Sequence, residues 1–374
     1  MNVHESNKIE TMLEHQGFLP SKTEDSADII IFNTCTVRNT AEQKIISHLA
    51  LVHKEKERGR NLVLGIVGCL SQREGVAKDL KRKFPYLDII LGTHNIGDIA
   101  VAVKAAVKSE KTHEIIKERK FDSGFEDNYS LISGSLGTGN RNHFINITYG
   151  CENYCTYCIV PYVRGKLISR SVNDIREEFK QSILSKPKLV YLLGQNVNSY
   201  LCDHTNTNFV ELLKILCEDL VGLRKDLAPD LDCQINFMSS HPKDFSLELV
   251  DLIASRPEIE RNIHLPLQSG SDKILRLMNR KYTSGEYKDK IDYLRKKVPG
   301  VRITTDIICG FPGESEEDFL ETVNFVKQIK FDSAFVFPYS RRSGTSADRM
   351  PDQIDHKTKK RRTTELLEII KQAK

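Results

Sequence analysis

The sequence predicts two α/β domains in series: a doubly wound N-terminal domain, and then a parallel β/α barrel or part of one. Three observations support this. The 374 residues are too many for one hydrophobic core. Apolar strand-like segments alternate with helix-like segments along most of the chain. A Lys/Glu-rich and then Gly/Ser-rich stretch interrupts this alternation once, which is typical of a linker.

The first domain is expected over residues 1–115. It begins with a short amphipathic helix carrying Ile9, Met12 and Leu13, and an apolar strand follows at 28–32. A helix with one apolar face over 41–52 leads to strand-like segments at 61–67 and 87–91. Strands separated by helices of this length imply a parallel sheet. The linker is placed at 116–140.

The second domain is expected over 141–350, with a terminal helix at 351–374. Its strand-like segments lie at 143–148, 188–193, 233–238, 262–265, 301–309 and 333–338. Most are followed by helix-like stretches. Six such units in series predict a parallel barrel, a fold that places chemistry at the carboxyl ends of its strands.

Composition narrows the class of protein. With 39% hydrophobic and 28% charged residues, the chain is neither disordered nor fibrous. Its longest apolar stretch, 62–70, is too short for a membrane span, and the charged first residues argue against a signal peptide, so we expect a cytoplasmic protein without a membrane partner. A net charge of +4 permits nucleic-acid binding without requiring it. Nine cysteines, three of them within eight residues, favour metal binding over disulfides.

The three clustered cysteines, Cys151, Cys155 and Cys158, directly follow the first barrel strand with the spacing C-x3-C-x2-C. Soft thiolates suit iron, and such short intervals keep three side chains in one concavity. Three protein ligands would leave one iron of a cubane open, as a catalytic centre needs. A zinc site is an alternative but would need a fourth ligand, and no His lies within five residues. Three unrelated buried thiols are the other alternative.

This loop, with Tyr157 before its last cysteine, resembles the signature of radical S-adenosylmethionine enzymes. The segments 149–165, 192–200, 264–271 and 304–314 are similar to those of the methylthiotransferases in that superfamily. The stretches 194–198 and 239–242 most resemble the group that methylthiolates dimethylallyladenosine in tRNA. The resemblance covers nearly the whole chain.

The resemblance implies a radical SAM partial (β/α)6 TIM-like barrel and the transfer of a methylthio group to carbon-2 of a prenylated adenosine beside the tRNA anticodon. It implies two 4Fe-4S clusters, S-adenosylmethionine as cofactor, and an electron donor such as flavodoxin or ferredoxin. Alternatives are methylthiolation of threonylcarbamoyl-adenosine in tRNA or of a ribosomal-protein aspartate. A non-catalytic iron–sulfur module for electron transfer or sensing is a rival from another class.

In that family an auxiliary 4Fe-4S cluster is held by three cysteines of the first domain. Cys35 and Cys69 fit two of these positions, since each follows a predicted strand at the start of a helix, where the helix dipole lowers a thiol pKa. Without the resemblance, each would be a buried structural thiol. The third cysteine is absent. We expect either that the true start lies upstream of Met1 or that this cluster is incomplete.

Several residues at the predicted strand ends are candidate cofactor ligands. Gly194, Gln195 and Asn196 could meet the amino group of S-adenosylmethionine. Gln268 and Ser269 could bond its ribose or carboxylate, and Asp306 and Gly310 belong to the fifth strand and its loop. Ordinary βα turns are the alternative for the glycines. Tyr157 could stack on the adenine or serve as a core aromatic.

Basic residues suggest where RNA would bind. Arg164 and Arg170 follow the cysteine loop and could hold a phosphate or form a salt bridge to a neighbouring carboxylate. The densest basic run contains Lys357, Lys359, Lys360, Arg361 and Arg362, and would be either a solvated helix face or a tRNA backbone contact. Members of this family usually end in a small RNA-binding β-barrel domain. No such domain follows Lys374 in this sequence, so we expect weak tRNA affinity.

Overall fold

The chain forms two compact units in the computed structural model. One unit comprises Met1–Gly137 with Tyr162–Gly165, and the other comprises Thr138–Pro161 with Lys166–Lys374. No helix among the described residues is long and apolar enough to cross a membrane. The structure describes residues 2–34, 39–73, 75–108, 113–115, 142–226 and 231–372.

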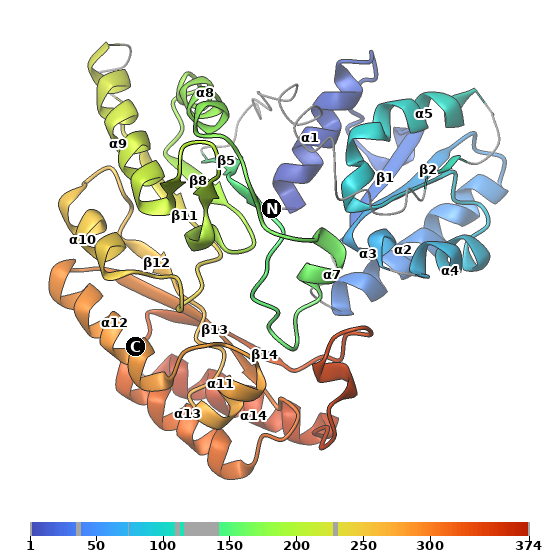
Figure 1. The fold of residues 1–374 in the computed structure, drawn as a ribbon. Coiled ribbons are helices and arrows are strands. Elements are labelled where there is room, and N and C mark those ends of the chain that lie inside the picture. Colours follow the sequence, from blue (N-terminus) through green and yellow to red (C-terminus); the bar gives the residue numbers. More distant parts are fainter. Residues whose placement is uncertain are drawn as a thin grey trace. The chain divides into compact units, whose positions relative to one another are not determined.

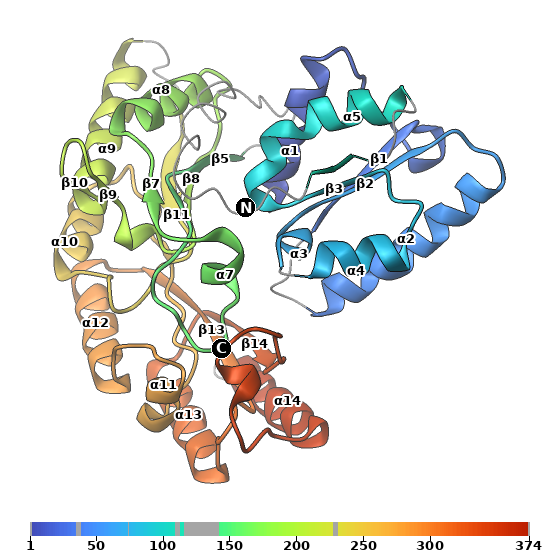
Figure 2. The same ribbon diagram turned by 45° about the vertical axis from the view of Figure 1, so that its right-hand side comes forward.

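The first unit contains a four-stranded parallel sheet whose strand order follows the chain. The strands are β1 (Ile29–Thr34), β2 (Val63–Gly68), β3 (Ile89–Leu91) and β4 (His113–Ile115). Helices cover both faces (Figures 1 and 2): α1 (Asn2–Glu14) and α5 (Ile99–Val107) lie on one, and α2 (Asn39–Glu57), α3 (Cys69–Gln72) and α4 (Val76–Lys83) lie on the other. β4 was not expected as a strand.

Two apolar cores explain this layered arrangement. Leu49 and Val52 of α2 pack with Leu64 and Ile66 of β2 on one face, whereas Ile9 of α1 contributes to a second core on the other face. A parallel strand sandwiched between helices is buried on both sides. The nearly unbroken apolar run of β2 therefore reflects its central position in the sheet.

The second unit is an open row of six parallel strands, as predicted. These are β5 (Asn142–Asn146), β8 (Leu189–Leu193), β11 (Gln234–Phe237), β12 (Asn262–His264), β13 (Arg302–Cys309) and β14 (Ser333–Pro338). They form two three-stranded sheets, β5-β8-β11 and β12-β13-β14, linked through the parallel bridge between Ile235 and Ile259. This is the partial barrel expected from six β/α units, and it confirms the predicted fold class.

Helices cover the outer side of this row (Figures 1 and 2). They are α8 (Val172–Ile183), α9 (Phe209–Asp226), α10 (Leu247–Ser255), α12 (Ser284–Lys297), α13 (Glu316–Ile329) and α14 (His356–Gln372). Shorter elements are α7 (Val160–Arg164), α11 (Asp272–Leu277) and two antiparallel strand pairs, β6 (Thr148–Tyr149) with β7 (Ile168–Ser169) and β9 (Leu201–Cys202) with β10 (Thr207–Asn208).

Local sequence fixes where the outer helices begin. The Ser171 and Ser246 side chains accept hydrogen bonds from the first turns of α8 and α10. Thr283 and Ser315 form reciprocal capping boxes at the starts of α12 and α13. These caps satisfy backbone donors that a helix leaves unpaired at its N-terminus.

Alternation along β13 distinguishes the two sides of the barrel wall. Ile303, Ile307 and Cys309 are buried against the outer helices, whereas Thr304 and Asp306 are only partly buried. Successive strand residues point to opposite faces. Thr304 and Asp306 therefore belong to the inner face of the row, where a ligand can reach them.

Candidate functional site

The three predicted cluster cysteines share one short loop between β6 and α7. Cys155 is buried, and Cys151 and Cys158 are partly buried. The Cys158 amide donates to the Cys155 carbonyl at 2.9 Å, which closes a tight turn. Burial raises the pKa of Cys151, and burial together with the nearby Cys155 raises that of Cys158 to about 12. All three thiols therefore belong to one compact loop that is largely shielded from solvent.

The donor set of this loop fits an iron–sulfur cluster. Within the part of the chain that the structure describes, no three His, Cys, Asp or Glu side chains are grouped to hold one metal ion. Thiolate sulfur is the donor that such clusters use, and the cysteines of a 4Fe-4S cluster bind different irons. Three thiols on one short loop therefore suit a cluster with one open iron.

A segment distant in sequence holds the cysteine loop in place. The Thr156 amide donates to the Met278 carbonyl at 3.1 Å. The Asn279 side chain donates to the carbonyls of Asn153 and Tyr154 at 3.1 and 3.0 Å. Tyr154 has a φ of 47°, a left-handed conformation that these contacts support. The loop is therefore shaped by contacts with the turn after α11.

The end of β8 carries three of the predicted cofactor ligands. At Gly194 an added Cβ would lie 2.1 Å from the Thr148 hydroxyl, so only glycine fits there. Gln195 is half-buried, and Asn196 is buried and donates to Asp244 at 2.6 Å. The Asn196 Oδ1 is buried without a hydrogen-bond partner. A buried unpaired oxygen is costly, so this acceptor fits a ligand donor such as an amino group.

Gln268 and Ser269 differ in what they offer a ligand. Gln268 has a φ of 74°, and its backbone pairs with β13 through Asp306 and Ile308 at 2.8 and 2.9 Å. Its Oε1 is buried without a partner, which again fits a ligand donor. Ser269 is fully buried, and its hydroxyl lies 3.2 Å from that of Thr322 on α13. The Ser269 hydroxyl thus has a partner within the protein, and its contact with the cofactor stays a prediction.

Asp306 and Gly310 lie on β13 and just after it. Asp306 is partly exposed on the inner face, with an oxygen 3.4 Å from His264 Nε2. Gly310 has a φ of 72°, and an added Cβ would lie 2.4 Å from the Lys359 side chain of α14. Glycine at this position therefore accommodates the close approach of α14, and the contact of Gly310 with the cofactor stays a prediction.

Tyr157 packs as a core aromatic, which is one of the two roles that the sequence allows. Its ring packs against a small apolar cluster that includes Met278 and Phe311. Its hydroxyl lies 3.4 Å from Arg280 Nη1. Stacking on an adenine stays a prediction for this residue.

Both predicted RNA-binding arginines are paired with carboxylates. Within the first unit, Arg164 lies 2.7 Å from Glu5, and both side chains are buried. Within the second unit, Arg170 lies 2.5 Å from Glu178, also with little exposure. The salt-bridge alternative is therefore present at both arginines, and a contact with an RNA phosphate stays a prediction.

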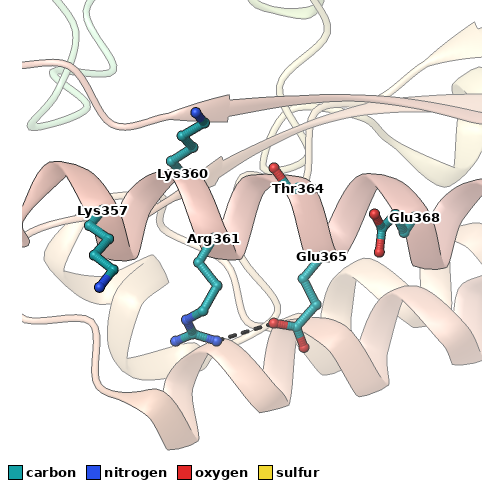
Figure 3. A pocket seen from close by; sticks show the side chains of 6 residues that line it. All are labelled: Lys357, Lys360, Arg361, Thr364, Glu365 and Glu368. Atoms are coloured by element: carbon teal, nitrogen blue, oxygen red, sulfur yellow. Dashed lines mark hydrogen bonds and ion pairs between the residues drawn. The ribbon is translucent and has the colours of Figure 1, made fainter.

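The basic run on α14 is divided between internal and exposed roles. Arg362 is buried and pairs with Glu314 at 2.7 Å and Glu316 at 2.9 Å. Figure 3 shows the exposed side of the helix, where Arg361 pairs with Glu365. Lys357 and Lys360 line that same surface. Much of the run therefore anchors the helix.

The predicted auxiliary ligands are described only in part, since Cys35 lies outside the described residues. Cys69 is buried at the start of α3, immediately after β2. Gly68 permits this turn with a φ of 104°, where an added Cβ would lie 2.7 Å from the Thr34 carbonyl. Burial lowers the pKa of Arg164, but the charges of Glu5 and Cys69 outweigh it and raise that pKa. Cys69 therefore lies beside a cation.

Two functional candidates, Arg280 and His241, were not predicted from the sequence. Arg280 Nη1 lies 3.3 Å from the Cys155 sulfur, and His241 Nε2 lies 4.0 Å from it. Burial and the Arg280 charge lower the pKa of His241 to about 2, so the ring is neutral. Its Nδ1 accepts from the Lys243 amide at 3.2 Å, which leaves the proton on Nε2, facing sulfur. The stretch 239–242, which contains His241, is noted above only because it resembles the methylthiotransferase group. No motif or spacing in the sequence indicates a role for Arg280.

Comparisons with known proteins identify both halves of the chain. Residues 145–326 match the Radical SAM superfamily, and residues 1–92 match the uncharacterized protein family UPF0004. Among solved structures, the radical S-adenosylmethionine methyltransferase TsrM from Kitasatospora setae, with cobalamin and a 4Fe-4S cluster bound, has a TM-score of 0.63. It is 14% identical, and the match covers 92% of this chain and 73% of that one. This likeness shows the fold.

Curated relatives match almost the full chain. The tRNA-2-methylthio-N(6)-dimethylallyladenosine synthase of Clostridium botulinum (strain Langeland) is 41% identical over 371 residues, or 99% of this chain and 79% of the relative. Those of Clostridium beijerinckii and Thermoanaerobacter pseudethanolicus are 44% and 42% identical, covering 99% of this chain and 78% and 75% of the relatives. The chain therefore belongs to the tRNA-2-methylthio-N(6)-dimethylallyladenosine synthase family of radical S-adenosylmethionine methylthiotransferases.

Proposed function

We propose that this chain methylthiolates carbon-2 of N6-dimethylallyladenosine beside the anticodon of tRNA. The observation that carries the proposal is the three-cysteine loop after the first barrel strand, in a barrel whose other strand ends carry buried acceptors without partners. When bound, the reduced 4Fe-4S cluster and S-adenosylmethionine supply a 5′-deoxyadenosyl radical. Cys151, Cys155 and Cys158 would hold three of the four irons and leave one open to the cofactor.

The chain's own residues would orient the cofactor and exclude water. Asn196 Oδ1 and Gln268 Oε1 are buried acceptors on two different strand ends, so together they can fix a ligand with two donor groups. Gly194 lets the backbone pass close to Thr148, where the Cβ of any larger residue would clash with the Thr148 hydroxyl. Asp306 extends this polar rim along the inner face of β13.

The auxiliary cluster is the second part of the proposal. We assign Cys69 and Cys35 as two of its ligands, with sulfur or methylthio delivery as its role. Cys69 is supported by its position at a helix start and by the neighbouring Arg164, because both favour a thiolate.

The partners follow from this chemistry. A tRNA with a prenylated adenosine is the substrate, and a flavodoxin or ferredoxin would supply electrons in the cytoplasm. An adenosine must leave its stack to reach a buried radical, so single-stranded loop recognition is expected. Lys357 and Lys360 on the exposed side of α14 are the cations of the basic run best placed for a phosphate backbone.

The test begins with anaerobic cluster reconstitution, followed by dithionite, S-adenosylmethionine and tRNA. The wild-type chain should form 5′-deoxyadenosine and convert dimethylallyladenosine to its methylthio form, both measured by mass spectrometry. Cys151→Ser should abolish both products. Cys233→Ala, a buried cysteine of the barrel core, is the matched control and should retain them.

The substrate is decided by offering tRNAs that carry dimethylallyladenosine or threonylcarbamoyl-adenosine, and the ribosomal protein, in parallel. Methylthiolation of only the second or third would contradict the proposed substrate. Absence of 5′-deoxyadenosine from a cluster-loaded wild-type chain would instead favour the non-catalytic iron–sulfur module.

A further inference from the structure

Arg280 is a buried arginine that faces the cysteine loop. Only 4% of its surface is exposed. Its Nε donates to the Tyr282 hydroxyl at 3.0 Å, and its Nη2 donates to the Pro266 carbonyl at 3.1 Å. Its Nη1 points at the Cys155 sulfur, 3.3 Å away, with the Tyr157 hydroxyl at 3.4 Å. Most of its donors are therefore committed to atoms of the barrel.

These contacts lack an obvious counter-ion. A buried guanidinium is costly unless an anion compensates its charge. The contacts are with two tyrosine hydroxyls, one backbone carbonyl and one thiol, and no carboxylate among the described residues forms an ion pair with Arg280. A cysteine that ligates iron is a thiolate. Cys155 is thus the one contact of Arg280 that cluster binding turns into an anion.

The backbone around Arg280 directs its side chain towards the loop. Asn279 and Lys281, its two neighbours, have φ values of 58° and 59°. Two left-handed residues on either side of one residue form a strained turn, which persists only where contacts compensate it. Asn279 supplies such contacts through the carbonyls of Asn153 and Tyr154. The same turn therefore forms hydrogen bonds to the cysteine loop through Asn279 and places the Arg280 guanidinium beside Cys155.

We propose that Arg280 is a positioning residue of the radical cluster, which donates a charge-assisted hydrogen bond to the Cys155 thiolate, with the His241 Nε2–H as a second donor. This inference rests on the proposed function, since it assumes that Cys155 ligates the cluster. Ionic hydrogen bonds are stronger than neutral ones, and donors to a ligand sulfur stabilise the state with more negative charge. Arg280 thereby raises the reduction potential of the cluster and eases uptake of the electron.

The test measures the cluster without tRNA or S-adenosylmethionine. Reconstituted wild-type, Arg280→Gln and Arg280→Lys chains are assayed for iron and sulfide, and the midpoint potential is read by electron paramagnetic resonance during a dithionite titration. Arg276→Gln is the matched control, because Arg276 is exposed on the preceding helix. His241→Phe keeps an aromatic ring against Tyr282 but removes the donor.

Arg280→Gln should retain its iron but lower the equilibrium constant for reduction about tenfold, which is about 59 mV for one electron. Arg280→Lys keeps the positive charge but lacks the planar set of guanidinium donors, so its midpoint potential should lie between those of Arg280→Gln and wild type. Arg276→Gln should have the wild-type potential. His241→Phe should shift the potential in the same direction by less. If Arg280→Gln does not fold, lowered potentials in Arg280→Lys and His241→Phe support the proposal, and unchanged potentials overturn it.

An Arg280→Gln cluster with the wild-type potential would overturn this role and leave the proposed function intact. Failure of the wild-type chain to bind any cluster would overturn the proposed function itself. A shifted potential in a chain that forms no methylthio product would support the role of Arg280 and contradict the proposed activity.

Discussion

Replacing Glu314 by Gln should make the protein more stable at alkaline pH. Glu314 is buried between β13 and α14, where it accepts from the Gly310 amide at 2.6 Å and pairs with Arg362 at 2.7 Å. Burial outweighs these favourable contacts and raises the pKa of Glu314 from 4.5 to about 7. Glutamine keeps a neutral acceptor of the same shape at this position.

The sign of the effect follows from proton linkage. The folded chain holds the Glu314 proton more tightly than the unfolded chain, so the stability contributed by this group is present below pH 4.5 and is lost as the pH rises through 7. A shift from 4.5 to about 7 corresponds to about 3 kcal/mol in the free energy of unfolding. Most of that loss, about 2 to 3 kcal/mol, falls between pH 5 and pH 8.

The assay is urea unfolding followed by circular dichroism for wild type and Glu314→Gln at pH 5, 6, 7 and 8. The quantity compared is the difference between the two chains, because all other titrations are common to both. The stability of the variant relative to wild type should rise with pH, most steeply near pH 6, midway between the unfolded and folded pKa values of Glu314, and should level off above pH 7. A difference that stays constant, or that turns against the variant at pH 8, would refute the reasoning and show that Arg362 keeps the carboxylate ionised.

Three further substitutions test the packing of the second unit by the same unfolding measurement. Phe179→Ala removes a fully buried ring of α8 and should cost about 3 to 5 kcal/mol; a cost below 1 would contradict its place in the core. Tyr287→Phe removes the hydroxyl that donates to the Leu265 carbonyl at 2.8 Å and should cost about 1 kcal/mol. Arg176→Ala breaks a half-exposed pair with Asp219 and should cost less than about 1 kcal/mol, so a larger loss would be unexpected.

Much of the fold was predictable because parallel strands carry a strong apolar signal. Five of the six barrel strands lie within the predicted segments, and β5 begins one residue before its segment; β14 matches its segment at both ends. β4 was missed because three residues at the start of a polar stretch show neither periodicity nor a continuous apolar run. The predicted terminal helix is present as α14.

The site was predictable where its signal was local. Cys151, Cys155 and Cys158 are close in sequence, so their spacing alone indicated a shared centre. Arg280 lies 125 residues from the cysteine that it contacts, and no spacing rule spans such a distance. The same reason explains why the close approach of α14 to Gly310 was not predicted, since Lys359 lies far from Gly310 in the sequence.

The same limit applies to the predicted RNA-binding arginines. Arg164 and Arg170 were predicted to bind RNA because they follow the cysteine loop in the sequence. Their carboxylate partners, Glu5 and Glu178, lie on other elements. A sequence shows that an arginine is present near a site, but only the fold shows whether its charge is already paired.

The contact between the cysteine loop and the turn at 277–282 also bears on how the protein matures. Thr156 and Met278 come from the first and fourth units of the barrel, so the shape of the loop depends on a contact between the two halves of the row. A cluster that binds only this folded arrangement links the two halves of the barrel, and it stabilises the folded chain more as its binding becomes tighter relative to its supply. Iron delivery would then select chains that have already folded, and loss of the cluster would loosen the link between distant segments.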